Sequence, residues 1–73
     1  MINIKNIKNI KKGWAAMDAS NKWWWYSKKP MKYKDLLQWL PANNDDFYCC
    51  INNVFDIAPV DDWTKSLIKV GEK

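Results

Sequence analysis

The sequence predicts a small α+β domain of two β-hairpins, which form an antiparallel sheet, together with two or three short helices. Two patterns lead to this fold class. Aromatic and apolar residues form short runs on either side of turn-rich intervals, as in hairpins, and elsewhere apolar residues recur every three or four positions, as in helices. The 73 residues, 1–73, are expected to form one domain, close to the smallest size that a hydrophobic core alone can stabilise.

The N-terminal segment repeats a triplet, with Ile4, Ile7 and Ile10 each followed by lysine. This spacing puts the isoleucines in one helical stripe but on alternating faces of a strand. Residues 1–12 are therefore predicted to form a short helix that ends at Gly13.

The first hairpin is predicted from Trp14–Met17 and Trp23–Tyr26, which flank the turn-rich interval Asp18–Lys22. Because side chains alternate along a strand, Trp23 and Trp25 share one face, and the other two aromatic residues share the opposite face. Both faces of this strand are therefore aromatic. We expect one face to line the core and the other to meet a partner.

Two amphipathic helices are predicted in the second half of the chain. In residues 33–40 the apolar side chains recur at i, i+3, i+4 and i+7, and a proline ends the segment. A terminal helix is predicted after Asp61, which caps it. This helix carries Trp63, Leu67 and Val70 on one side, and Gly71 follows its end.

The second hairpin is predicted from Phe47–Ile51 and Val54–Ile57 around Asn52-Asn53, two residues that tolerate positive φ. Its first strand contains the adjacent Cys49 and Cys50. Neighbouring Cα atoms lie about 3.8 Å apart, which is too close for a relaxed disulfide. Two half-buried thiols on opposite sides of a strand are the favoured interpretation, and a strained vicinal disulfide or a redox site is the alternative.

Charged residues are distributed unevenly along the chain, whose formal net charge is +4. Residues 1–34 hold nine lysines and a single acid, whereas residues 35–73 hold three lysines and seven acids. This pattern predicts a basic and an acidic surface, which fits an anionic ligand or head-to-tail contact between copies in a homo-oligomer. Every basic residue is Lys, which lacks the planar fork that reads guanine, so sequence-specific DNA binding is disfavoured.

The composition predicts a non-enzymatic protein without a cofactor or metal site. The sequence contains no histidine, which is the usual general base, and its two glycines do not form a phosphate-binding loop. Ser66 with Lys65 or Lys69 is interpreted as a set of ordinary surface residues. Two pairs of adjacent acids, Asp45-Asp46 and Asp61-Asp62, are interpreted as a solvated loop and a helix start.

No segment of the sequence predicts export or a membrane span. Residues 1–12 alternate Ile with Asn and Lys, and the longest apolar run, Phe47–Ile51, is far too short to cross a bilayer. We expect a cytoplasmic protein with reduced thiols and no membrane partner.

Aromatic rings and lysines together form the predicted binding site. A flat ring stacks on a nucleobase, with a contribution of about 1–3 kcal/mol per base, and nearby ammonium groups neutralise phosphates. We therefore expect an oligomer that sequesters a small anionic nucleotide through the strand aromatics, the lysines after them and a C-terminal segment. The predicted ligand-binding residues are Trp23, Trp25, Tyr26, Lys28, Lys29, Asp62, Trp63, Lys65 and Ser66.

Three other interpretations of the aromatic and basic patch stay open. A protein inhibitor would place the patch against an enzyme, with Trp and Tyr as interface anchors. A non-specific single-strand binder would need a longer basic track than one hairpin offers. The rings could also fill the core of the domain or a subunit interface, where tryptophan is enriched.

Three stretches of the chain carry a family resemblance: Lys12–Asp18, Trp23–Pro30 and Asp56–Ile68. They contain a Gly-Trp start, a Trp-x-Trp-Tyr strand followed by Lys-Pro, and an Asp-Trp-x-x-Ser-Leu segment. In these features the chain resembles short accessory proteins of tailed bacteriophages and prophages. The region around Trp14 is also similar to that of phage proteins that sequester cyclic-nucleotide immune signals between the subunits of an oligomer. The resemblance implies action against host defence in the cytoplasm of an infected bacterium, by holding such a signal or by binding a host defence protein.

Overall fold

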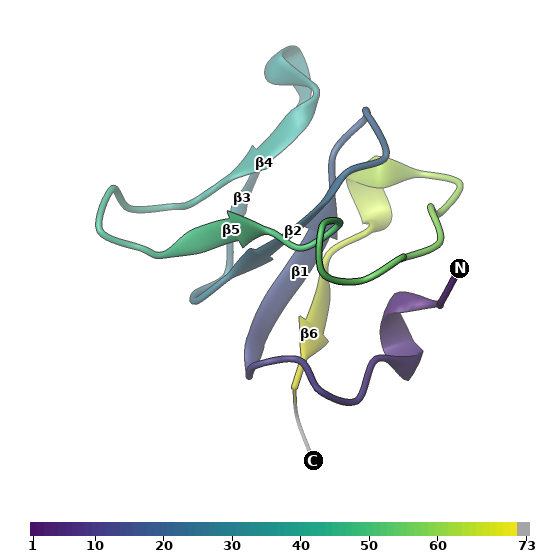
Figure 1. Cartoon of the computed structure of the whole chain (residues 1–73). Coiled ribbons are helices and arrows are strands. Elements are labelled where there is room, and N and C mark those ends of the chain that lie inside the picture. The colour runs from purple at the N-terminus through teal and green to yellow at the C-terminus, as the bar shows by residue number, and fades with distance from the viewer. Residues whose placement is uncertain (72–73) are drawn as a thin grey trace.

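The computed structural model of this chain describes residues 1–71. These residues form two antiparallel sheets, and their helical elements are single 3-10 turns (Figure 1). The fold is therefore mainly β. The predicted antiparallel sheet is present, but the two or three predicted helices are not found in the residues that the structure describes. The strands are β1 (Gly13–Met17), β2 (Trp23–Tyr26), β3 (Met31–Tyr33), β4 (Gln38–Leu40), β5 (Tyr48–Cys50) and β6 (Ile68–Val70). The 3-10 turns are η1 (Ile4–Asn6), η2 (Lys34–Leu36) and η3 (Trp63–Lys65).

The first predicted hairpin is confirmed, and it forms the middle of the larger sheet. This sheet has the order β5-β2-β1-β6. β1 and β2 are antiparallel, with Trp14 opposite Tyr26 and Met17 opposite Trp23. Asn21, with φ of 68°, lies in the turn between them. Asn tolerates this left-handed conformation better than most residues, so the turn chemistry and the aromatic pattern specify the same hairpin.

The predicted helix over residues 33–40 is wrong, because this segment belongs to a small two-stranded sheet formed by β3 and β4, with η2 at its tip. A helix of this length is marginal unless its apolar face packs well. In the hairpin the Trp39 side chain enters the core, and the Trp39 amide donates to Asp18 Oδ1 at 2.9 Å. These tertiary interactions favour the strand over the helical turn that the spacing predicted.

Only the first strand of the second predicted hairpin forms. β5 pairs with β2, but the chain then turns, and the amides of Val54 and Phe55 both donate to Ile51 O, at 3.1 and 2.9 Å. The side chain of Asn52 does not serve a hairpin turn. Its Oδ1 accepts a hydrogen bond from Trp23 N at 3.0 Å, which extends the contact between β5 and β2.

The predictions of a helix at each end of the chain are also wrong, because each segment contains only a single 3-10 turn. In residues 1–12 only η1 is helical, and Ile2 forms a parallel bridge with Ile57. In the C-terminal segment the cap of η3 is Asp62, not Asp61, and the chain then enters β6. β6 pairs with β1, so it supplies partners for backbone groups of β1 that a helix would leave without hydrogen bonds.

Both faces of the larger sheet are covered. The first face carries Trp23 and Trp25 and packs against the N-terminal segment and residues 51–60. The second face carries Tyr26 and packs against the small sheet through Trp39. The expectation that one aromatic face of β2 meets a partner is therefore wrong, because segments far away in the sequence occupy both faces.

Candidate functional site

The three aromatic side chains predicted to stack on a ligand are buried. Trp23, Trp25 and Tyr26 have exposed fractions of 0%, 5% and 1%. The indole nitrogens of the two tryptophans donate to Ala58 O and Lys11 O, at 3.2 and 2.9 Å. These rings offer no free face to a base, so they do not stack on a ligand as predicted.

The predicted contacts from the C-terminal segment serve the fold. The buried Ser66 hydroxyl accepts from Met17 N at 2.8 Å and donates to Trp63 O at 2.7 Å. Asp62 Oδ1 accepts from the hydroxyl and the amide of Thr64, at 2.6 and 3.0 Å. The hydroxyl is the main reason that the pKa of Asp62 is held below its usual range. These residues fix η3 and join it to β1, and the half-buried Trp63 ring packs on the core.

The predicted phosphate-binding lysines, Lys28 and Lys29, are exposed, and so is Lys65, which was predicted to add a contact from the C-terminal segment. Lys29 lies beside a ring that was not predicted to belong to the site. Its Nζ is 5.8 Å from the centre of the Trp14 ring, and Lys69 Nζ is 5.6 Å from the same ring. An ammonium group at this distance is attracted by the ring quadrupole. Trp14 therefore lies beside one of the predicted lysines, but it is half-buried and does not line the pockets described below.

A pocket of about 390 Å³, which we call the tyrosine pocket, lies between the small sheet and β5. Tyr33 of β3 and Tyr48 of β5 line it, and their exposed fractions are 41% and 45%. The loop after β4 adds Pro41, Asn43 and Asn44 to its lining. Two accessible tyrosines and two asparagines thus line one pocket, although they come from three separate segments.

Tyr48 is held in the tyrosine pocket by the register of the larger sheet. Tyr48 lies opposite Tyr26, and their rings are stacked with centres 6.0 Å apart and planes at 14°. Trp24 packs beside Tyr48 with a centre-to-centre distance of 5.9 Å. Tyr26 itself is fixed, because it is buried and its hydroxyl donates to Trp39 O at 3.1 Å. Burial also raises the pKa of Tyr26 far above its usual range. A ligand would therefore meet a Tyr48 ring that is already oriented.

The chemistry of the tyrosine pocket suits a planar polar molecule. Aromatic rings stack on planar groups, and an Asn amide offers both donors and an acceptor to the edge of such a group. Tyr33 also lines an adjoining hollow of about 350 Å³ with Lys32 and Lys34. Lys32 Nζ lies 3.4 Å from Thr64 O, so Lys34 is the better placed to meet an anion.

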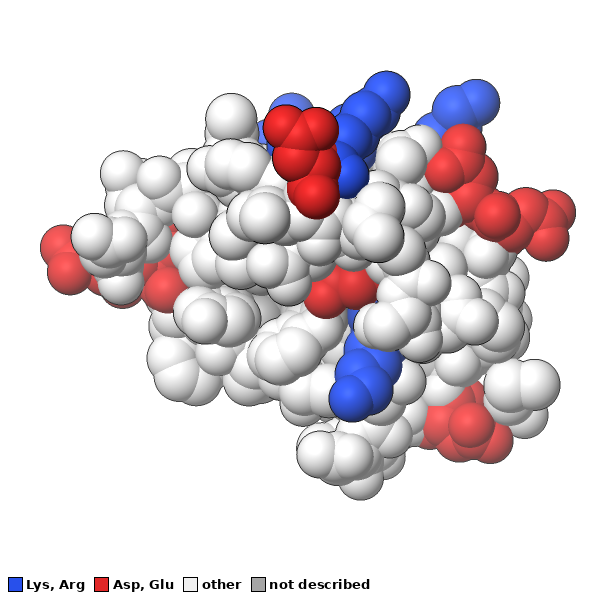
Figure 2. Space-filling model, turned by 90° about the horizontal axis from the view of Figure 1, so that it is seen from above, with Lys and Arg blue, Asp and Glu red and all other residues white. Residues whose placement is uncertain are grey.

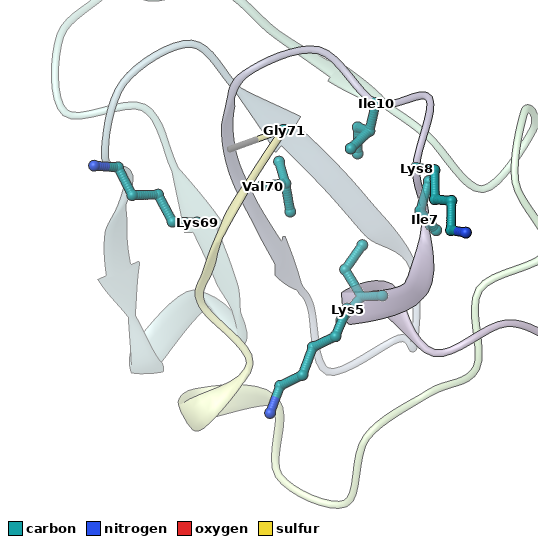
Figure 3. A pocket seen from close by; sticks show the side chains of 8 residues that line it. Lys5, Ile7, Lys8, Ile10, Lys69, Val70 and Gly71 are labelled. Carbon is teal, nitrogen blue, oxygen red and sulfur yellow. The ribbon is translucent and has the colours of Figure 1, made fainter. Parts of the chain in front are cut away.

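A second hollow, which we call the isoleucine groove, lies between the N-terminal segment and β6 and has a volume of about 410 Å³ (Figure 3). Ile10 and Val70 line it. The side chains of Lys5, Lys8 and Lys69 extend away from the middle of the groove (Figure 3). The groove contains no aromatic ring among its lining residues, so it lacks the stacking surface that the tyrosine pocket has.

Charges of both signs lie on the side of the molecule shown in Figure 2. Acidic groups and lysines lie next to each other at several places on this side, and wide uncharged areas separate these places. This side is therefore not a surface of one sign, although the sequence predicts a basic and an acidic half. The folded chain brings residues of both halves together, since β1 and β2 lie between β5 and β6.

Asp18 is a buried carboxylate that joins the β1–β2 turn to the small sheet. Burial raises its pKa, and the hydrogen bond from the Trp39 amide opposes this effect. The Trp24 indole also lowers this pKa, although Trp24 Nε1 is buried without a hydrogen bond of ordinary geometry. Asp18 borders a further hollow of about 430 Å³ at the tip of the small sheet, which Leu36 and Leu37 also line.

No protein-family model, curated protein or solved structure matches this chain. In residues 1–71 no helix is long and apolar enough to span a membrane. Cys49 and Cys50 are free thiols. The likeness to phage accessory proteins stays a prediction.

Proposed function

We propose that this protein is a non-catalytic binding protein that captures a small anionic nucleotide in the tyrosine pocket. One observation carries the proposal: two half-exposed tyrosines, Tyr33 and Tyr48, line one pocket together with two asparagines. The proposal keeps the ligand class predicted from the sequence. It replaces the buried tryptophans of β2 by tyrosines of β3 and β5.

The size and the chemistry of the pocket support this ligand class. A volume of about 390 Å³ falls at the lower end of the range of about 300–1,000 Å³ that is typical of small-molecule sites. In the proposed complex a base stacks on Tyr48 and Tyr33, and Asn43 or Asn44 binds the edge of the base. Lys34 meets a phosphate as a point charge.

The proposed biological setting is the cytoplasm of a bacterium infected by a phage. It rests only on the sequence resemblance to phage accessory proteins. A protein that sequesters an immune signal needs affinity and abundance but no turnover. Binding without catalysis is consistent with the absence of histidine from the sequence.

The test is a thermal-shift series with cyclic dinucleotides, cyclic trinucleotides, mononucleotides and short single strands. A ligand that binds only the folded chain raises the melting temperature, and at 100 times its Kd it adds about 2.7 kcal/mol of stability. We expect Tyr48→Ala and Tyr33→Ala to lose the shift. Phe47→Ala, which removes an exposed ring outside the pocket lining, is the matched control and should keep it.

Three results would contradict the proposal. The first is no shift with any nucleotide, and the second is an equal loss of the shift in Phe47→Ala. The third is binding only to long single strands with steep salt dependence, which would indicate a non-specific nucleic-acid binder.

A second candidate function, inhibition of a host protein, is favoured by the tip of the small sheet. Leu36 and Leu37 are 56% and 59% exposed there. Leu37 also has φ of 57°, a conformation that costs a branched residue about 1–3 kcal/mol. Strained, exposed apolar residues are typical of contact loops. If this tip binds a protein, cross-links from a bacterial extract should map to residues 35–38 and should be lost in Leu36→Ser.

A further inference from the structure

We propose that two copies of this chain pair through the outer edge of β5, so that their four-stranded sheets join across a two-fold axis. The inference does not rest on the nucleotide proposal. It rests on the backbone of β5, on the exposure of the residues around it and on the symmetry of its hydrogen-bonding groups.

The backbone of β5 has one satisfied side and one open side. Ser27 N donates to Phe47 O at 2.9 Å, and Ile51 N donates to Trp23 O at 3.1 Å, so Phe47 and Ile51 point their backbone groups toward β2. Backbone groups of successive residues point to opposite sides of a strand. The N–H and C=O of Cys49 therefore also point toward β2, whereas those of Tyr48 and Cys50 point away from it. β5 is the last strand of its sheet, and within residues 1–71 no backbone hydrogen bond reaches these outward groups.

The outer edge of β5 lacks most of the features that prevent an edge strand from pairing with another chain. Natural edges often carry Lys, Pro or a bulge, and the opposite edge of the sheet, β6, carries Lys69. Residues 47–51 contain none of these residues and no charge. Phe47 and Tyr48 are 64% and 45% exposed beside the edge, so pairing would also bury apolar surface.

A second copy of β5 is the occupant that matches this edge. In an antiparallel pair centred on Cys49, Tyr48 of one copy lies opposite the partner's Cys50, and these two residues exchange both of their backbone hydrogen bonds. Every outward group of Tyr48 and Cys50 then has a partner. The pairing spans β5, and residues 47–51 contain no charge, so no like charges oppose each other along the paired strands.

The same register brings Cys49 opposite the partner's Cys49. This is a pair without mutual backbone hydrogen bonds, in which Cα atoms lie about 4.5 Å apart. That distance falls within the range of about 4.4–6.8 Å that a disulfide accepts. The interface therefore predicts which of the two adjacent cysteines reacts, although the association itself is non-covalent.

The first test is cross-linking of the purified reduced protein with diamide, followed by electrophoresis without reductant. The two Cys49 thiols would form one S–S bond, and their two protons and two electrons would reduce the diazene to a hydrazine. We expect Cys50→Ser to cross-link as well as the wild-type chain. With Cys49→Ser, the amount of cross-linked dimer should fall by roughly nine-tenths or more. Equal cross-linking by the two variants, or none in either, would overturn the register.

The second test compares Cys50→Pro with Cys50→Val by light scattering. Proline removes the outward N–H of residue 50 but no hydrogen bond to β2, and such an edge position tolerates it. We expect Cys50→Val to keep a mass twice the 8.7 kDa of one chain and Cys50→Pro to be a folded monomer. A wild-type protein that stays monomeric at all concentrations, or a Cys50→Pro variant that stays dimeric, would overturn the proposal.

The two proposals can fail separately. A Cys50→Pro monomer that still responds to a nucleotide would support the tyrosine pocket in each single chain. A wild-type dimer that responds to no nucleotide would support the β5 interface alone.

Discussion

The aromatic residues of β2 and those of the tyrosine pocket have opposite environments, although the sequence draws attention only to the first group. Trp23, Trp25 and Tyr26 stand in a central strand with neighbouring strands on both sides. Tyr33 and Tyr48 stand on β3 and β5, and roughly half of each ring is exposed. β2, which has the sequence most typical of a ligand-stacking surface, therefore lies at the centre of the core.

The difference has a physical cause in the size of the domain. A chain of 73 residues has little apolar surface to bury, so its largest side chains are needed in the core. A dense run of tryptophans in a small domain therefore indicates burial before binding. Isolated tyrosines at sheet edges remain accessible, because their hydroxyl groups stay in water while one ring face packs.

The largest expected difference between the two groups is in stability. Trp23→Ala should cost about 3–5 kcal/mol, because it leaves a cavity in the fully buried first face of the sheet. A domain of this size has a total stability of roughly 3–5 kcal/mol, so the variant should be largely unfolded at 25 °C. Urea unfolding followed by circular dichroism measures this. A Trp23→Ala variant that stays folded would contradict the difference between the two groups of aromatic residues, since the ring would then not be essential to the core.

A smaller loss is expected where the core depends on a buried hydroxyl. Ser66→Ala removes the acceptor of the Met17 amide, and the buried amide is then left without that partner. We expect a loss of about 1–3 kcal/mol in the free energy of unfolding. Ser20→Ala, at the exposed β1–β2 turn, is the control and should change stability by less than about 0.5 kcal/mol.

The pH dependence of stability tests the effect of burial on the carboxyl group of Asp18. Burial raises the pKa of Asp18 in the folded chain above its unfolded value, so the folded protein binds this proton more tightly. The contribution of Asp18 to stability should be fully present below the unfolded pKa and should be lost as pH rises through the folded pKa. Asp18→Asn keeps an acceptor for the Trp39 amide but does not titrate.

The wild-type chain should therefore gain stability relative to Asp18→Asn as pH falls from neutral to mildly acidic. Urea titrations of both chains over that range measure the difference. A relative loss for the wild-type chain on acidification would show that hydrogen bonding to the charged carboxylate outweighs the effect of its burial.

The smallest effect on stability is expected in the tyrosine pocket. Tyr33→Ala removes a ring that is 41% exposed on a two-stranded sheet, and we expect a loss below about 0.5 kcal/mol. The same variant should lose the stabilisation by nucleotide. A large loss of stability without ligand would indicate that Tyr33 serves the fold, and the two groups of aromatic residues would then no longer differ.

Local patterns predicted the first hairpin and the strand that becomes β5, but not the other elements. In β1 and β2 the alternation of large side chains and the turn residues specify the same structure, so the prediction is confirmed. In residues 33–40 the apolar spacing fits a helix. The structure is instead a hairpin, because Asp18, which lies far away in the sequence, accepts the amide of Trp39. No local pattern contains that contact.

The candidate site was predicted by chemistry but not by position. The sequence contains aromatic rings and lysines, and their pairing as a ligand-binding surface was the basis of the hypothesis. The tyrosine pocket is assembled from β3, the loop after β4, and β5, which are brought together only when the sheets pack. Exposure was the missing signal, and a ring's exposure depends on what covers it.

The sequence by itself determined that this is a small chain with an aromatic first hairpin, since alternation and turn residues are properties of neighbouring positions. Only the tertiary structure decided the rest: the strands that replace two of the three predicted helices, the cover on both faces of β2 and the edge left open on β5. These outcomes depend on contacts between distant segments. For each segment, the hydrogen bonds and buried surface gained from those contacts outweighed its local preference.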